Sequence, residues 1–142
     1  MIQIDTNLFE DAVRKRAGWK SSSAVISWVK RGDIEGGVSA WTVATIYYFR
    51  RRLGMDDSQA RQKTGKVLKG FTVLDLTAKV VNAALPDKRF SDFEDALQFH
   101  TAEQNGVDTI VTRNVKHFGK VKDEIAVLTP EEFLARKKVA KS

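Results

Sequence analysis

The chain has 142 residues, of which 42% are hydrophobic, so its length and apolar content suit one domain with a single sizeable core. It contains no cysteine and two histidines, which excludes disulfides and thiolate metal sites and leaves little for an imidazole-based zinc site. Its formal charge of +6 favours a polyanionic partner only weakly. The N-terminus does not resemble a signal peptide and no apolar run could span a bilayer, so we expect a cytoplasmic protein with no membrane partner.

The first half of the chain carries alternating signals for strands and helices. Residues 1–5 alternate apolar and polar side chains and stop at a polar turn, which predicts a short strand with Asp5 at its carboxyl end. Three serines at 21–23 predict the N-cap of a helix that Gly32 ends. The other elements expected here are a strand at 37–40, a helix at 41–53 that Gly54 ends, and a helix at about 57–69.

The second half of the chain continues this alternation. Ser91 and Glu94 have the spacing of a capping box at the start of an acidic helix, and Thr129 and Glu132 repeat that spacing around Pro130 for the last helix. The expected strands are 71–74, 109–112 and 125–128, and the expected helices are 77–85, about 91–104 and 130 onwards. We expect one domain over residues 1–135 and a basic C-terminal tail over residues 136–142.

Strands separated by helical segments, without a two-residue hairpin signal between them, predict an α/β fold around a mainly parallel sheet. Ligands of such sheets bind beyond the carboxyl ends of the strands. Asp5 and the turn 112–114 both lie at such ends. The sheet should therefore bring them together although they are far apart in the sequence.

The acidic helix is the strongest candidate for chemistry, because it concentrates carboxylates, the ligands that a hard divalent cation requires. Asp92 is explained equally well as a first-turn acid that the helix dipole favours. Asp95 lies past the cap on the same face, and its repulsion of Asp92 costs stability unless a cation offsets it. Taken alone, Asp5 and Asn114 are as readily explained as turn or cap residues.

The two histidines are expected to have different surroundings. His100 falls on the apolar face of the acidic helix, which predicts a packed core histidine and not a catalytic base. His117 lies in a basic loop, where we expect it to be exposed.

Five sequence features follow one another along nearly the whole chain. They are Asp5-Thr6-Asn7, residues 38–40 leading into 46–48, residues 92–98, residues 111–114 and residues 128–133. Together they resemble a PIN domain. The resemblance implies a three-layer α/β/α sandwich with a central, mainly parallel sheet, and an endoribonuclease that depends on Mg²⁺ or Mn²⁺. It also implies the toxin half of a VapBC-type toxin–antitoxin pair, with a small antitoxin protein and often a second copy of the chain as partners.

The resemblance also implies roles for individual residues. Carried over position by position, it makes Asp5, Asp92 and Asp95 the catalytic, metal-binding acids, with Asp92 auxiliary. The residues expected to bind substrate or line the site are Thr6, Asn7, Thr45, Thr112, Arg113 and Asn114. Of these, Arg113 is expected to engage RNA phosphate together with nearby lysines.

Three positions where the family commonly has acids carry other side chains here, namely Thr45, Asn114 and His117. We therefore expect weak metal affinity and at most one tightly bound ion. These substitutions also leave an alternative function open, in which the protein is a catalytically impaired PIN-fold protein that acts by binding RNA or another protein.

Overall fold

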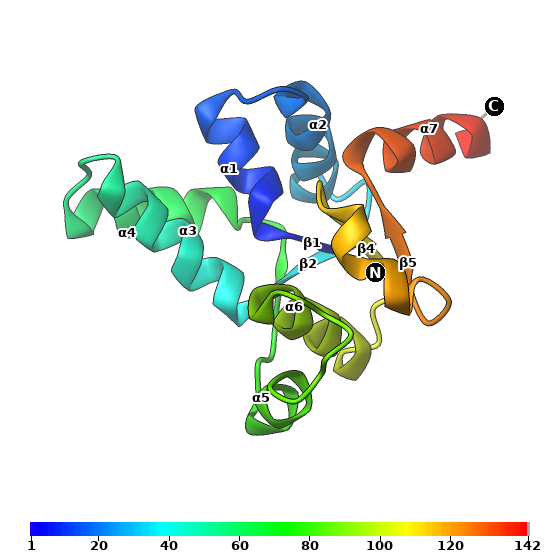
Figure 1. Ribbon diagram of the computed structural model, residues 1–142. Helices are drawn as coiled ribbons and strands as arrows, with labels where there is room; N and C mark the ends of the chain where they lie inside the picture. Colours follow the sequence, from blue (N-terminus) through cyan, green and yellow to red (C-terminus); the bar gives the residue numbers. More distant parts are fainter. Residues whose placement is uncertain (142) are drawn as a thin grey trace.

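The centre of the molecule is a parallel sheet (Figure 1). The structure, a computed structural model, describes residues 1–141, with side chains described through Lys137. In this part of the chain the sheet has five strands in the order β3-β2-β1-β4-β5, and all neighbours run parallel. The strands are β1 (Ile2–Ile4), β2 (Gly36–Ser39), β3 (Thr72–Leu74), β4 (Thr109–Val111) and β5 (Ala126–Leu128). Every strand expected from the sequence is confirmed.

The helices connect these strands. They are α1 (Thr6–Arg14), α2 (Trp19–Lys30), α3 (Ala40–Arg52), α4 (Asp57–Val67), α5 (Ala78–Ala84), α6 (Phe93–Gln104), the 3₁₀ helix η1 (Val115–Val121) and α7 (Pro130–Lys141). The capping box predicted for α7 is present, because the Thr129 and Glu132 side chains each accept the other residue's backbone N–H at 3.1 Å. The predicted basic tail is helical through Lys141, and Ser142 lies outside the described residues.

Two helical starts in the first thirty residues differ from the sequence-based expectation. Helix α1 was not predicted, because Asp5 serves as its N-cap where we expected only a turn at the strand end. Helix α2 begins at Trp19 after Gly18, whose φ of 82° lies in the left-handed region that favours glycine. The three serines therefore lie inside α2, and Ser22 is buried against α1.

The core consists of two apolar clusters, one on each face of the sheet. Ile110 packs into one cluster and its neighbour Val111 into the other, as the alternation of side chains along a strand requires. Helices α1, α2 and α7 cover one face and α5 and α6 the other, while α3 and α4 pack together beside the sheet (Figure 1). This arrangement confirms the three-layer sandwich. None of the helices within residues 1–141 combines the length and apolarity needed to cross a membrane.

Candidate functional site

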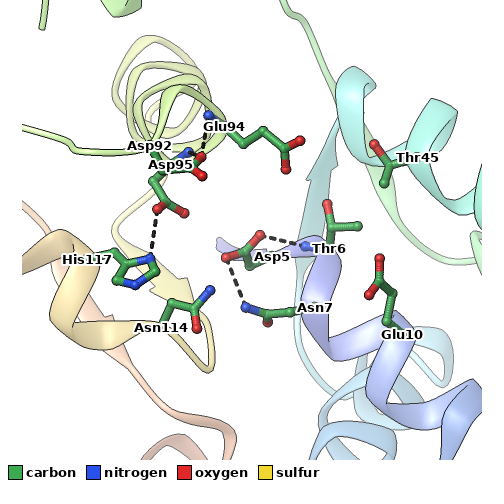
Figure 2. A pocket seen from close by; sticks show the side chains of 10 residues that line it. All are labelled: Asp5, Thr6, Asn7, Glu10, Thr45, Asp92, Glu94, Asp95, Asn114 and His117. Atoms are coloured by element: carbon green, nitrogen blue, oxygen red, sulfur yellow. Dashed lines mark hydrogen bonds and ion pairs between the residues drawn. The ribbon is translucent and has the colours of Figure 1, made fainter.

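A pocket of about 190 Å³ opens at the carboxyl ends of β1 and β4 (Figure 2). We call it the acidic pocket, because five carboxylates from the start of α1 and the start of α6 line it. The full set of lining residues is Asp5, Thr6, Asn7, Glu10, Thr45, Asp92, Glu94, Asp95, Asn114 and His117. The structure thus brings together all three predicted acids and four of the six predicted lining residues.

Asp5 forms one wall of the acidic pocket and is only 7% exposed. Its Oδ1 accepts the Thr6 backbone N–H at 2.7 Å, and its Oδ2 accepts the Thr112 hydroxyl at 2.7 Å and the Asn7 amide at 3.4 Å. Burial raises the pKa of Asp5 to about 6, since the Thr112 hydrogen bond only partly offsets the loss of hydration and the Asp95 charge raises it further. A cation in the pocket would stabilise the ionised form.

Asp92 caps α6, because its Oδ1 accepts the backbone N–H of Glu94 at 2.7 Å and that of Asp95 at 3.3 Å. The predicted Ser91–Glu94 capping box is therefore wrong, since the helix starts one residue later than that spacing requires. Glu94 is free to line the acidic pocket (Figure 2). Burial, followed by the charges of Asp92, Asp95 and Glu10, raises the pKa of Glu94.

Asp95 faces the same cavity from the wall opposite Asp5 (Figure 2). Its Oδ2 lies 2.9 Å from Nδ1 of His117, which η1 presents. Burial raises the pKa of Asp95, and the His117 contact counteracts that shift. His117 is half-exposed, as expected, but its contact with Asp95 had not been predicted. His100 has the predicted core environment, with Nε2 lying 2.8 Å from Oδ2 of Asp87.

Glu10 also lines the acidic pocket and was missed because α1 was missed. It lies one helical turn beyond Thr6, on the same face of α1. The apolar spacing of Leu8, Phe9 and Ala12 was the sequence signal that could have revealed this helix.

Two predicted site residues do not line the acidic pocket. Thr112 is fully buried. Its hydroxyl donates to the Asp5 carboxylate and accepts the Asn114 backbone N–H at 3.0 Å. Arg113 turns away from the pocket, and its guanidinium donates to Asp11 at 2.9 Å, to Glu131 at 2.6 Å, to Ser22 and to the Gly18 carbonyl. Because these groups take its donors, the structure does not support the expectation that Arg113 engages RNA phosphate. Asn114 makes no side-chain cap bond to η1.

A buried polar network fixes the floor of the site. Gln98 of α6 donates to Thr42 at 3.0 Å, and the hydroxyls of Thr42 and Thr6 lie 2.9 Å apart. Gln3 of β1 donates to the Gln98 carbonyl at 2.9 Å. This network holds α1, α3 and α6 at fixed positions around the carboxylates.

The chemistry of the donor set suits a hard divalent cation, because carboxylates and hydroxyls dominate the lining. Within residues 1–141, no three acidic or histidine side chains converge tightly enough to form a preformed metal cage. Mg²⁺ retains several waters and needs only one or two protein carboxylates, so Asp5 and Asp95 could hold a hydrated ion in a cavity of this size. The pKa of Asp5 is raised mainly because the carboxylate is buried, and the negative charge of Asp95 adds to that shift.

Comparison with known proteins relates this arrangement to others. A family model described as PIN domain matches residues 2–116. A search of curated protein sequences gave no significant match.

Among solved structures, a toxin–antitoxin complex from Klebsiella pneumoniae is 18% identical with a TM-score of 0.67, and the match covers 92% of this chain and 98% of that chain. VapBC2 from Rickettsia felis bound to a DNA fragment from its promoter is 18% identical with a TM-score of 0.66, covering 89% and 97%. FitAcB from Neisseria gonorrhoeae is 20% identical with a TM-score of 0.64, covering 92% and 98%. At these identities the structures show a shared fold, and the family match over most of the sequence shows that the chain belongs to the PIN domain family.

Proposed function

We propose that this protein is a metal-dependent endoribonuclease that hydrolyses RNA phosphodiester bonds. The observation that carries this proposal is the acidic pocket, where five carboxylates surround a cavity and burial raises the pKa of Asp5 to about 6. Folding brings these like charges together at a cost in stability, which points to a cation as their counter-charge.

Asp5 and Asp95 would hold Mg²⁺ or Mn²⁺ from opposite walls of the pocket, with Asp92 as an auxiliary acid. An ion bound there supplies Lewis acidity, which lowers the pKa of a bound water and stabilises the charge that develops on the phosphate. Thr112 and Thr6 fix the orientation of the Asp5 carboxylate through their hydrogen bonds. Glu94 has a raised pKa, which suits it to accept a proton from the attacking water.

A cleavage assay tests this proposal. Single-stranded and structured RNA are incubated with the protein and Mg²⁺ or Mn²⁺, and the rates of wild type, Asp5→Asn and Asp95→Asn are compared. Each variant should lose at least about 100-fold in rate, because each removes a carboxylate that holds the ion. Asp33→Asn is the control, since Asp33 is an exposed acid outside the acidic pocket. Equal rates for all four proteins would point to a contaminating nuclease and contradict the proposal.

We further propose that the protein is the toxin of a toxin–antitoxin pair with an antitoxin protein as its partner. Two similar structures are described as a toxin–antitoxin complex and as VapBC2. A second pocket between α1, α2 and α3 is lined mainly by apolar side chains, including Phe9, Ile26 and Phe49, which suits an apolar side chain of a protein partner.

Co-expression with the product of the adjacent gene should give a complex that no longer cleaves RNA. Sedimentation of the free protein would establish whether it forms the homodimer common in the family.

One observation favours a second candidate function, a catalytically impaired protein that binds RNA. Oδ2 of Asp95 already contacts Nδ1 of His117. In addition, no preformed three-ligand metal cage occurs in the described residues. His117→Asp frees Asp95 from this contact and adds a carboxylate. A large gain in metal-dependent cleavage would favour the impaired site, whereas unchanged or reduced cleavage would favour a site that is already competent.

A further inference from the structure

A basic pocket adjoins the acidic one. It encloses about 330 Å³, and its lining residues are Lys88, Arg89, Ser91, Lys116, His117, Gly119 and Lys120. No carboxylate lines it. His117 lines both pockets, so the two cavities share one wall.

The lysines of the basic pocket are available to a ligand. Lys88, Lys116 and Lys120 are exposed, and none of them forms an ion pair with any residue of the described chain. Arg89 differs, because its guanidinium pairs with Asp87 at 2.9 Å and with Glu124 at 2.7 Å. The positive charge of the pocket therefore comes mainly from the three lysines.

The acidic pocket by itself repels the RNA backbone, since its carboxylates and a phosphodiester carry the same sign of charge. In the metal-free protein, affinity for RNA must therefore come from cations beside the acidic pocket. Lysine suits this role, because its ammonium group is a point charge on a flexible stem that can follow a mobile phosphate.

We propose that the basic pocket binds a backbone phosphate of single-stranded RNA while a neighbouring phosphodiester lies over the acidic pocket. This inference rests on the proposed nuclease function for the role of the acidic pocket. Lys116 and Lys120 of η1 and Lys88 of the α5–α6 loop provide the charge. The shared wall at His117 places the two subsites next to each other, as neighbouring phosphates of one strand require.

A matched pair of substitutions at Gly119 tests the basic pocket. A Cβ atom at Gly119 would meet no atom within 4 Å, and its backbone does not require glycine, so a side chain can be added there. Gly119→Glu places a carboxylate among the lysines, whereas Gly119→Gln adds the same bulk without charge. Binding of a fluorescently labelled single-stranded RNA is measured by anisotropy in EDTA, so that cleavage cannot interfere. Gly119→Glu should weaken binding about tenfold relative to Gly119→Gln.

Gly65→Glu controls for the change in net charge, because Gly65 lies on α4 and also has open space around its Cβ position. It should weaken binding by less than about twofold. An equal loss from Gly65→Glu and Gly119→Glu would show only a response to net charge and overturn the proposal. Displacement of the RNA by polyglutamate as readily as by unlabelled RNA of matched charge would assign the pocket to acidic polypeptides and also overturn it.

The lysines provide an independent measurement. The Lys116→Ala/Lys120→Ala double variant should lower the slope of log K against log salt by about 0.7 for each lost phosphate contact. The Lys63→Ala/Lys66→Ala double variant on the exposed face of α4 should leave that slope near the wild-type value. A slope unchanged by the first pair would contradict the proposal. In the cleavage assay the first pair should raise KM more than it lowers kcat.

Failure of this proposal is distinguishable from failure of the nuclease function, because binding is measured without metal. If Gly119→Glu binds RNA more weakly but Asp5→Asn cleaves RNA as fast as wild type, the phosphate subsite is retained and the nuclease function is rejected. Metal-dependent cleavage together with equal binding by Gly119→Glu and Gly119→Gln would retain the nuclease and reject the subsite.

Discussion

Asp5 is a buried acid whose ionised form is poorly hydrated, and this makes the stability of the metal-free protein depend on pH. Its pKa is about 6 in the folded protein against an ordinary value of 3.8. Between these values the folded state binds more protons than the unfolded state, so the Asp5 contribution to stability decreases as pH rises from about 4 to about 6. The full shift corresponds to a loss on the order of 3 kcal/mol.

Urea unfolding in EDTA at several pH values measures this effect. The free energy of unfolding of wild type minus that of Asp5→Asn should fall between pH 4 and pH 6 and level off above that range. A difference that stays flat or rises would contradict the assignment. Adding Mn²⁺ above pH 6 should raise the Tm of wild type and leave that of Asp5→Asn nearly unchanged.

Asp92 combines two roles that substitution can separate. Asp92→Ala removes the acceptor for two backbone N–H groups of α6 and should cost about 1 kcal/mol of stability. Asp92→Asn retains a side-chain oxygen for the cap and should cost less than about 0.5 kcal/mol. If the carboxylate also serves the ion, both variants should cleave RNA more slowly than wild type. If Asp92→Asn cleaves RNA at the wild-type rate, Asp92 acts only as the N-cap of α6.

At the scale of elements, Arg113 joins three helices to the end of β4. Its guanidinium contacts Asp11 of α1, Ser22 of α2 and Glu131 of α7. Arg113→Ala should cost about 2–4 kcal/mol, because buried Asp11 loses one of its two arginine partners. Arg113→Lys should recover only part of this loss, since an ammonium group cannot reproduce the fork of donors. Thermal or urea unfolding measures both effects.

Arg31→Ala is the matched control for Arg113. Arg31 also pairs with an aspartate, Asp33, but both side chains are exposed, at 61% and 45%. Exposed ion pairs contribute little, so this substitution should change stability by less than about 0.5 kcal/mol. A loss as large as that of Arg113→Ala would mean that burial does not set the strength of these pairs.

The elements differ in how far their own residues specify them. Strands β1 to β5 were predictable because short β-branched or alternating runs end at polar turns, and α7 because its capping box uses neighbours in sequence. Helix α1 was missed because an aspartate that starts a turn and one that starts a helix make the same local hydrogen bonds, so only the apolar spacing after Asp5 distinguishes them.

The candidate site divides along similar lines. The meeting of Asp5 and Asp95 follows from a parallel sheet whose strand ends share one edge. The contact of Asp95 with His117 depends on how η1 packs, and the contact of Arg113 with Asp11 depends on how α1 packs. The local sequence around these residues does not specify how the helices pack against one another.

At the scale of the whole molecule, one sheet connects both cores and should make unfolding a single transition. Ile4→Ala removes buried atoms on one face and should cost about 2–5 kcal/mol, whereas Phe99→Ala on the other face should cost about 3–5 kcal/mol. Both should lower the urea midpoint without changing the m-value. Two separate transitions in either variant would contradict a shared cooperative unit.

The central position of β1 has a consequence for the order of events during synthesis. Asp5 is translated before Thr112, whose hydroxyl holds its carboxylate and which lies 107 positions later. Strand β1 cannot complete its pairing until β4 has been translated. A nascent chain therefore carries Asp5 without the pocket around it, and the nuclease proposed above would be unable to cleave the message from which it is being made.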